Sequence, residues 1–335
     1  MMHDIQVMTR PTLLLNDKEI HGVFDWTLAI SALKQAYSQP QTGSNFPPRS
    51  MARGDGVWLR TLSGVFPNSN VMGSKQISAS IKGKKASYLI TLFDQNSSEC
   101  LCLMDAQSIT GFRTAATSIL AIQHLLGHKV GKVGVVGSGF EAKTHVRALA
   151  AVMSVEHVEV FSPRAESRQR FLDDLKDTGV SMSAVESAEQ AVLGADVVIC
   201  AARSKDELPT IKGEWLSDGM VVVSIGSTLP EQRELDEEAI RRACLIVADM
   251  PEEVAEDTGD MITAKAKGVD FEEKLVSLAD LVQGLVMRQG TSGVVIYKSV
   301  GAALQDLAVA HMCYEHALEK GLGIELPNAI TPVSK

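Results

Sequence analysis

The sequence predicts an α/β protein with a doubly wound parallel sheet and a second domain of the α+β type. Three observations support this prediction. The length of 335 residues corresponds to about two domains. From residue 129 to residue 250, short apolar runs alternate with helical patterns, as in a parallel sheet covered by helices. Several of these runs are almost entirely Val and Ile, as expected for strands that are buried on both faces.

Residues 12 to 118 follow the α+β pattern. Apolar residues at helical spacing start after Asp25 and end at the Pro-, Gly- and Ser-rich stretch from Gln39 to Ser50. The next apolar runs predict strands of one sheet, namely VWLRTL, GSKQISASI, SYLITLFD and ECLCLMD. The segment RTLSGVFP is expected to form a strand, a tight turn and a second strand.

The pattern of apolar residues changes at Ile109. An Ala- and Leu-rich helix, ITGFRTAATSILAIQHLL, leads to Gly127. The strand candidates after it are KVGVVG, HVEVFS, VSMSAV, DVVICAA, MVVVSIG and CLIVAD. A last helix, SVGAALQDLAVAHMCYEHALEKG, is expected to return to the first domain. We therefore place the α+β domain at residues 1–118 with 302–335 and the parallel sheet at residues 119–301.

Charge and composition exclude several classes of protein. The chain has 32 basic and 41 acidic residues, a formal charge of −9. Nucleic acids and anionic membranes require a basic face, so we expect neither as a partner. The segment MMHDIQVMTR lacks the pattern of a secretory signal, and five cysteines do not form a disulfide framework. We therefore expect a cytoplasmic protein without a membrane span.

A glycine-rich loop carries the most specific chemical signal. It follows an apolar strand and opens a helix, and its G-x-G-x-x-A pattern consists of Gly137, Ser138, Gly139, Phe140, Glu141 and Ala142. In this context the pattern predicts a Rossmann-type dinucleotide site. The first glycine permits the turn, the second lets backbone approach the pyrophosphate, and Ala142 allows close packing of the helix on the strand. The alternative is a tight strand-to-helix turn that binds nothing.

The end of the next strand indicates which dinucleotide binds. NAD sites often carry an acidic residue there, but Phe161 is followed by Ser162, Pro163 and Arg164. Ser162, Arg164 and Arg168 are candidates to bind a 2′-phosphate, because guanidinium groups match phosphate geometry. We therefore expect NADP(H), with NAD(H) as the alternative. A solvated loop whose arginines bind nothing is the other interpretation.

Motifs along most of the chain resemble the ornithine cyclodeaminase/mu-crystallin family. The two most specific are I-T-x-x-R-T-A-A from Ile109 to Ala116 and P-x-x-R-E-L-D from Pro230 to Asp236. Gly73-Ser74-Lys75, the glycine loop, GDMITA and YKSVGAALQDLA add support. The resemblance implies hydride exchange between a nicotinamide and the α-carbon of an imino or amino acid. It also implies a homodimer formed by the α+β domains and an active site in a cleft.

The resemblance assigns roles to individual residues. Lys75 and Arg113 match family positions that bind the substrate carboxylate and support catalysis, and Arg49 matches an arginine near the same carboxylate. Arginine pairs with a carboxylate through two parallel hydrogen bonds, which would fix the α-carbon. Thr114, within the same motif as Arg113, and Ser227 are expected to contact the cofactor. Without the resemblance, charged residues such as Arg49, Lys75 and Arg113 would more often be interpreted as surface residues.

One departure from the family pattern bears on the reaction. Thr228 stands where ornithine cyclodeaminases have an aspartate, and VWLRTLSG lacks their second acid. A distal ammonium group buried without an anion is costly, which disfavours ornithine as substrate. We therefore expect an imine reductase or amino-acid dehydrogenase in which Thr228 assists proton transfer. A cyclodeaminase and a non-catalytic, crystallin-like NADPH-binding protein are the alternatives.

Other polar residues are expected to have structural roles. Cys100 and Cys102 have no second pair of ligands for zinc, so no metal site is expected. His145, one turn into the helix after the glycine loop, is expected at a cap or on the surface.

Overall fold

The computed structural model describes residues 10–202, 208–327 and 329–333. The first nine residues, which contain most of the segment examined for a secretory signal, lie outside them. The chain divides into two compact units. The first contains Met1–Ala32, Gln39–Arg113 and Ala302–Lys335, and the second contains Leu33–Ser38 and Thr114–Gly301. The expected boundaries were 118/119 and 301/302.

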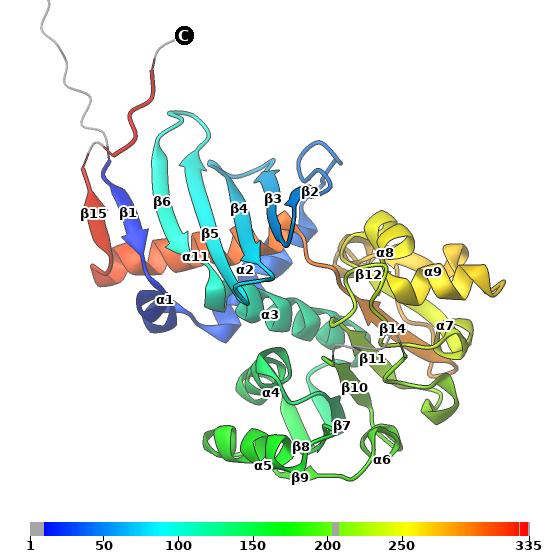
Figure 1. The fold of residues 1–335 in the computed structure, drawn as a ribbon. Coiled ribbons are helices and arrows are strands. Elements are labelled where there is room, and N and C mark those ends of the chain that lie inside the picture. Colours follow the sequence, from blue (N-terminus) through cyan, green and yellow to red (C-terminus); the bar gives the residue numbers. More distant parts are fainter. Residues whose placement is uncertain (1–9, 203–207, 328, 334–335) are drawn as a thin grey trace, which may run out of the picture. The chain divides into compact units, whose positions relative to one another are not determined.

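The first unit is built on a seven-stranded sheet with the order β15-β1-β6-β5-β4-β3-β2. Its strands are β1 (Thr12–Leu15), β2 (Ser50–Gly54), β3 (Val57–Val65), β4 (Val71–Ser80), β5 (Lys85–Asp94), β6 (Cys100–Asp105) and β15 (Ile324–Leu326). Strands β2 to β6 form an antiparallel meander. Helix α11 (Ala303–Lys320) contacts β3, β4 and β5 along one face (Figure 1).

Two short helices and one long helix complete this part of the chain. They are α1 (Asp17–Val23), α2 (Trp26–Ser38) and α3 (Gln107–Leu126). Helix α1 begins with a capping box between Asn16 and Glu19, which satisfies two otherwise unpaired amide groups. The two-unit division falls within α2 and α3, so Arg113 and Thr114 are neighbours in sequence but belong to different units.

The prediction of a turn within RTLSGVFP is wrong. Strand β3 continues through this segment to Val65, and Gly64 pairs with Gly73 of β4. A Cβ atom on Gly64 would lie 2.5 Å from the ring of Phe46, so the glycine provides room for packing and not a turn. Between the strands, turns lie at Pro67-Asn68, Lys82-Gly83 and Gln95-Asn96, where the residue types favour them.

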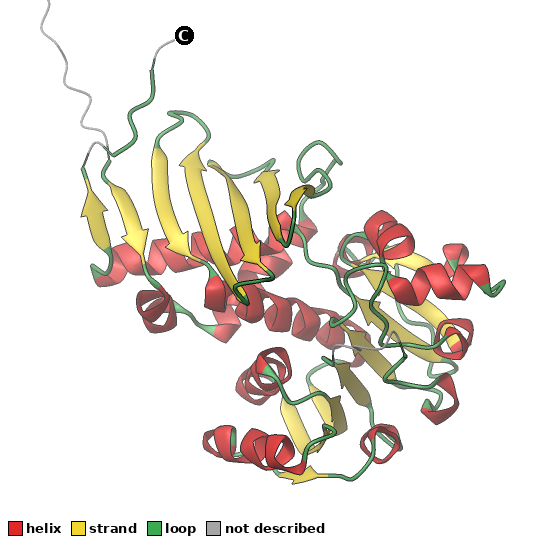
Figure 2. Cartoon of the chain, viewed as in Figure 1, coloured by secondary structure: helices red, strands yellow, loops and turns green. Residues whose placement is uncertain are grey.

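The second unit contains an eight-stranded parallel sheet with the order β13-β12-β14-β11-β10-β7-β8-β9. Helices lie around these strands (Figure 2). The strands are β7 (Lys129–Val136), β8 (Ser154–Phe161), β9 (Met182–Ala184), β10 (Val197–Cys200), β11 (Val221–Ser224), β12 (Ala243–Ala248), β13 (Leu275–Ser277) and β14 (Val294–Lys298). The predicted doubly wound parallel sheet is thus confirmed, and β13 and β14 are strands that the sequence analysis missed.

The helices of the second unit connect successive strands. They are α4 (Phe140–Val152), α5 (Ala165–Asp174), α6 (Ala188–Val192), α7 (Glu237–Arg242), α8 (Pro251–Asp257), α9 (Gly259–Ala266) and α10 (Leu278–Val282). Short 3-10 turns cover Lys176–Thr178, Gly213–Trp215 and Glu272–Lys274. The central strands β10 and β11 are completely buried, which explains their continuous Val and Ile runs.

His145 does not lie on the surface or at a cap. Its side chain is fully buried in α4, with Nδ1 2.7 Å from the carbonyl of Glu141 and Nε2 2.9 Å from Oγ of Ser118 on α3. Burial lowers the pKa of His145 to about 4, partly opposed by the hydrogen bond to the Glu141 carbonyl. The neutral ring therefore joins α4 to α3.

Candidate functional site

The glycine loop has the geometry of an anion-binding turn. It links β7 to α4, and Gly137 has φ +115°, a conformation that favours glycine. A Cβ on Gly137 would lie 2.6 Å from the carbonyl oxygen of Ala201, whereas nothing lies within 4 Å of a Cβ on Gly139. Gly139 is the N-cap of α4 and provides no side-chain cap, which leaves the first amide groups of α4 available for an anion.

The topology places this loop where such folds bind dinucleotides. From β7 the chain adds β8 and β9 toward one edge of the sheet. It then returns to the other flank of β7 and adds β10 and β11 toward the opposite edge. The strand order therefore reverses between β7 and β10, and the carboxyl ends of these strands carry Gly137 and Ala201. Ligands of open α/β sheets bind at this position. The loop, the helix terminus and the reversal together fit a dinucleotide.

The three residues proposed for a 2′-phosphate differ in their surroundings. Arg164 is exposed at the N-cap of α5, and Ser162 is half-buried after β8. Arg168 is buried, and its guanidinium donates to the carbonyl of Ser162 at 2.8 Å and to the carboxylate of Glu186 at 2.7 Å. These bonds use part of the hydrogen-bonding capacity of Arg168, so Arg164 is the more accessible arginine.

The other predicted cofactor residues of this part of the chain lie in the glycine loop, in the first turn of α4 or on α3. Ser138 and Glu141 are half-buried, Phe140 is exposed and Ala142 is buried. Thr114 is buried on α3, where its carbonyl accepts a hydrogen bond from Ser118 at 3.0 Å.

The loop after β11 is held by Gln232. Ser227 Oγ donates to the Gln232 carbonyl at 2.5 Å, and the amide of Thr228 donates to Gln232 Oε1 at 3.1 Å. Thr228 is half-buried, and Ser227 is buried. These two bonds hold the chain at Ser227 and at the amide of Thr228.

A buried polar cluster that the sequence analysis did not assign supports the same loop. Glu234 accepts hydrogen bonds from the amides of Ala202 and Gly226 and from Ser224 Oγ. Lys298 Nζ lies 2.7 Å from the Asp260 carboxylate and donates to Ser224 Oγ and the Ser227 carbonyl, both at 2.9 Å. Burial raises the pKa of Glu234 to about 7, although the nearby Lys298 ammonium opposes the shift.

The first unit brings the predicted catalytic cations together. Lys75 on β4 and Arg113 on α3 both contact Oδ1 of Asp306 on α11, Lys75 Nζ at 2.8 Å and Arg113 Nε at 2.9 Å. Arg113 Nη1 also donates to Gln305 Oε1 at 2.6 Å. The exposed fraction is 1% for Lys75, 8% for Arg113 and 0% for Asp306. Two cations and one carboxylate are thus buried in contact.

Arg49 has a different position in the first unit. It is half-buried and lies immediately before β2, whereas Lys75 is on β4 and Arg113 is on α3.

The acidic residues of the two buried clusters were not predicted from the sequence, although each of them lies within a recognisable motif. Glu234, Asp260 and Asp306 all lie within motifs that carried the family resemblance, P-x-x-R-E-L-D, GDMITA and YKSVGAALQDLA.

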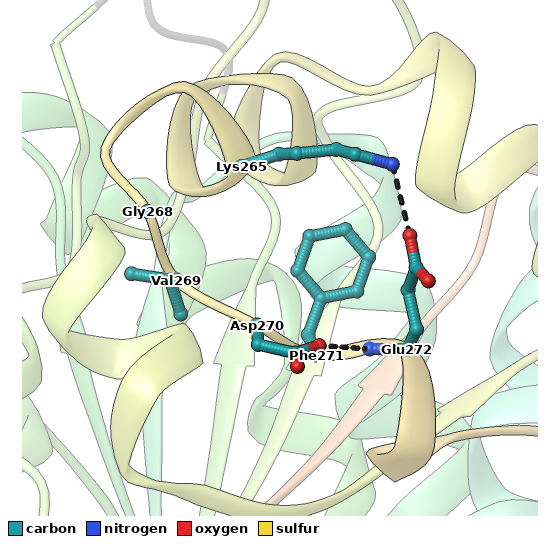
Figure 3. Close-up of a pocket in the computed structure, with 6 residues that line it drawn as sticks. All are labelled: Lys265, Gly268, Val269, Asp270, Phe271 and Glu272. Atoms are coloured by element: carbon teal, nitrogen blue, oxygen red, sulfur yellow. Dashed lines mark hydrogen bonds and ion pairs between the residues drawn. The ribbon is translucent and has the colours of Figure 1, made fainter.

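A separate pocket of about 310 Å³ contains none of the predicted residues (Figure 3). Lys265, Gly268, Val269, Asp270, Phe271 and Glu272 line it. The Lys265 ammonium lies 2.9 Å from Glu272 Oε1, so the cation of this pocket is already paired. The pocket offers no chemistry that connects it to the residues above.

Two surveys cover the part of the chain that the structure describes. No group of three or more His, Cys, Asp or Glu side chains there is arranged to hold a metal ion. In the same residues, no helix combines the length and apolar character needed to cross a membrane.

Comparison with known proteins identifies the family. Residues 71–321 match the sequence model of the ornithine cyclodeaminase/mu-crystallin family. The chain belongs to this family. An alanine dehydrogenase from Archaeoglobus fulgidus, a relative of this family member, is 28% identical over 323 residues, covering 94% of this chain and 98% of the relative.

Solved structures agree with the family assignment. Thermococcus litoralis Δ1-pyrroline-2-carboxylate reductase, in complex with NADH and L-proline, is 27% identical with a TM-score of 0.87, covering 94% of this chain and all of that chain. An archaeal alanine dehydrogenase dimer with bound NAD is 26% identical with a TM-score of 0.84, covering 94% and 98%. This family member therefore shares 94% of its length with these enzymes, two of which were solved with a bound nicotinamide cofactor.

Proposed function

We propose that this protein is an NAD(P)H-dependent oxidoreductase that exchanges hydride with the α-carbon of a small imino or amino acid. The observation that carries the proposal is the cluster of Lys75, Arg113 and Asp306. Two cations and one carboxylate are buried in contact there. A substrate carboxylate would pair with the cations, and the arginine would orient it.

The second unit would hold the nicotinamide dinucleotide. Gly137 and Gly139 allow close approach of the pyrophosphate, and the first amides of α4 would donate to it. When bound, the nicotinamide supplies the hydride for the carbon of the C=N bond, while the nitrogen gains a proton. Lys75 and Thr228 are the side chains that we assign to holding or moving that proton.

The preferred cofactor in this proposal is NADP(H). The end of β8 has no carboxylate to bind a ribose 2′-hydroxyl, and Arg164 is exposed nearby. Ser162 supplies a further hydrogen-bonding group, while Arg168 would contribute only the donors that Glu186 and the Ser162 carbonyl do not use. The related Thermococcus reductase was solved with NADH, so a preference for NADP(H) would distinguish the present chain from that relative.

The proposal includes a homodimer formed through the open face of the first sheet. The strand register places Val57, Leu59 and Val65 of β3 on the face opposite α11, together with Leu89 of β5. Their exposed fractions range from 38% to 48%. Soluble monomers rarely expose a large apolar patch, and the related archaeal alanine dehydrogenase is a dimer.

A cytoplasmic location is also part of the proposal. Five cysteines, four of them buried, are free thiols in this structure. Free thiols persist where glutathione and thioredoxin keep proteins reduced.

The test is an assay of the purified protein with NADPH and a panel of cyclic and acyclic α-imino acids. NADPH consumption with at least one of them is expected, without ammonia release from ornithine. Ammonia release from ornithine would favour a cyclodeaminase. NADPH binding without turnover of any panel member would favour a crystallin-like binding protein.

A further inference from the structure

The carboxyl ends of four neighbouring strands form one row across the second sheet. Val136 of β7 pairs with Cys200 of β10, which in turn pairs with Ser224 of β11. Ser224 then pairs with Lys298 of β14. Each of these residues is the last of its strand. The glycine loop follows Val136, so it lies at one end of the row and Lys298 lies at the other.

Lys298 connects the end of β14 to the loop after β11. Its ammonium group donates to Ser224 Oγ and to the Ser227 carbonyl, both at 2.9 Å, and lies 2.7 Å from the carboxylate of Asp260 on α9. Lys298 and Asp260 are completely buried. Because an ammonium group has three protons, these three contacts use all of its donors. Lys298 can therefore act only through the groups that it holds.

Glu234 holds the same loop through a second set of contacts. One of its oxygens accepts from the amide of Ala202, which follows β10, at 3.2 Å. The other accepts from the Gly226 amide at 2.8 Å and from Ser224 Oγ at 2.7 Å. A Cβ on Gly226 would lie 2.3 Å from Glu234 Oε1, so the contact requires a glycine there. The Glu234 carboxylate thus joins the loops that follow β10 and β11.

The anion of Asp260 completes the network. It pairs with Lys298 through one oxygen, and through the other it accepts from the amide of Glu234 at 2.7 Å. A buried ion network is a poor source of stability, because the cost of desolvation offsets the attraction between the charges. A network whose members are hydrogen-bonded does, however, fix one arrangement of the groups that it contacts. Here those groups are loops at the carboxyl ends of parallel strands, where open α/β sheets bind ligands.

We propose that Lys298 and Glu234 are positioning residues that hold the loops after β10 and β11 in place for the nicotinamide half of the cofactor. This inference rests on the proposed function, because it assumes a dinucleotide whose pyrophosphate lies at the glycine loop. The adenosine half would then lie beside β8, and the nicotinamide half would extend along the row over β10 and β11. The loop after β11 also carries Thr228, to which we assign a role in proton transfer.

The experiment compares binding of the whole cofactor with binding of its adenosine half by the full-length protein. Fluorescence titration measures NADPH, and isothermal titration calorimetry measures adenosine 2′,5′-bisphosphate. NADH and 5′-AMP form the equivalent pair if NADH binds more tightly than NADPH.

Lys298→Met removes all three donors and keeps an unbranched side chain. We expect this variant to bind NADPH about tenfold more weakly and to lower kcat for an imino acid about 100-fold, because a displacement of about 1 Å at the reacting groups has effects of this size. Its affinity for the bisphosphate should change by less than about twofold, because the adenosine half would contact neither loop. A general loss of stability would not separate the two halves of the cofactor in this way.

Two further variants guard against a folding defect in Lys298→Met, which leaves buried carboxylates without their cation. Lys298→Met/Asp260→Asn removes one charge of each sign, and the asparagine oxygen can still accept from the Glu234 amide. Glu234→Gln replaces one acceptor oxygen with an NH₂ group, which cannot accept from a backbone amide. Both variants should show the same difference between NADPH and the bisphosphate as Lys298→Met.

Lys132→Met is the matched control. Lys132 lies on β7 of the same sheet, pairs with Glu159 at 2.6 Å, and donates to the carbonyls of Gln190 and Leu193. These contacts resemble those of Lys298, but they hold the segment that precedes β10 and not a loop at the carboxyl ends of the strands. Lys132→Met should leave both affinities and kcat unchanged.

The outcomes separate this inference from the proposed function. If the variants of Lys298 and Glu234 lose both ligands equally or lose neither, the network only stabilises the fold and the inference is wrong, while an unmodified protein that reduces imino acids keeps the proposed function. The inference is also wrong if Lys132→Met shows the same difference. If the unmodified protein binds NADPH but reduces no imino acid, the proposed reaction fails and the binding comparison alone decides the inference. An unmodified protein that binds neither NADPH nor NADH overturns both.

Discussion

Lys75 and Arg113 contact the same carboxylate oxygen, so each helps to hold the other in place. We predict that Lys75→Ala and Arg113→Ala each lower kcat/KM for an imino acid at least about 100-fold, because a displacement of about 1 Å has effects of this size. NADPH affinity should remain near normal, since neither residue belongs to the glycine loop. Steady-state kinetics and NADPH fluorescence titration measure the two quantities.

Lys82→Ala is the control for this prediction. Lys82 is also paired with an aspartate, Asp55, but both side chains are exposed. Its loss should leave turnover unchanged. Turnover that survives both Lys75→Ala and Arg113→Ala would mean that other residues, with Arg49 and Arg60 as the next candidates, hold the carboxylate.

The second prediction concerns Arg164 and the choice of cofactor. Arg164→Ala should weaken NADPH binding about 10- to 100-fold, the range for a hydrogen bond to a charged group, and should hardly affect NADH. Arg170→Ala, an exposed arginine on the same helix, is the matched control. Fluorescence titration of both cofactors tests it, and tighter binding of NADH than of NADPH by the unmodified protein would contradict the assignment.

The sequence identifies the two cations of the buried cluster, Lys75 and Arg113, more readily than it identifies their anion, Asp306. Lys75 and Arg113 lie in short motifs that identify them without knowledge of their contacts. Asp306 lies 231 positions after Lys75, and only the packing of α11 against β4 brings them together. The resemblance pointed to the segment around Asp306, but no spacing within the sequence indicated that this residue would pair with the cations.

Helix α4 contains His145, whose pKa leads to a prediction about how stability depends on pH. The pKa of His145 is about 4 in the folded protein and 6.5 in a model peptide, because burial disfavours the charged ring. The unfolded chain therefore binds a proton that the folded protein does not. The contribution of His145 to stability is complete above pH 6.5 and falls by about 3 kcal/mol as the pH decreases to 4.

The variant His145→Gln tests this prediction. Gln has no titrating group, so the free energy of unfolding of the variant should decrease less between pH 6.5 and pH 4 than that of the unmodified protein. Urea unfolding at several pH values in this range gives the comparison. Parallel pH profiles for the two proteins would show that His145 does not account for the loss.

Element prediction succeeded where the hydrophobic pattern was long and failed where the element was short or interrupted. Strands β7, β10 and β11 are apolar runs between turn residues, and the alternation identified them. Strands β1 and β15 have only four and three residues, too few to establish a period. Strand β14 lies between β12 and β11 and was not predicted, because it runs directly into the segment that resembles a family motif.

For the molecule as a whole, we predict a dimer through the open face of the first sheet. Light scattering of the unmodified protein should give twice the 36.0 kDa of one chain. Leu59→Asp should shift the mass toward 36.0 kDa, because a charge in an apolar interface remains unpaired. Leu318→Asp, which changes an exposed leucine on α11, should not. A mass of 36.0 kDa for the unmodified protein at micromolar concentration would contradict the dimer.

The first unit is discontinuous in sequence, and this has a consequence for folding during synthesis. Residues 114–301 leave the ribosome before α11 and β15, so the second unit is complete while the first still lacks its last segment. Until α11 emerges, β3, β4 and β5 lack their covering helix, and Lys75 and Arg113 lack the carboxylate that compensates their charge. Closure of the first unit is therefore a late, long-range step, and one face of its sheet stays uncovered until α11 has emerged.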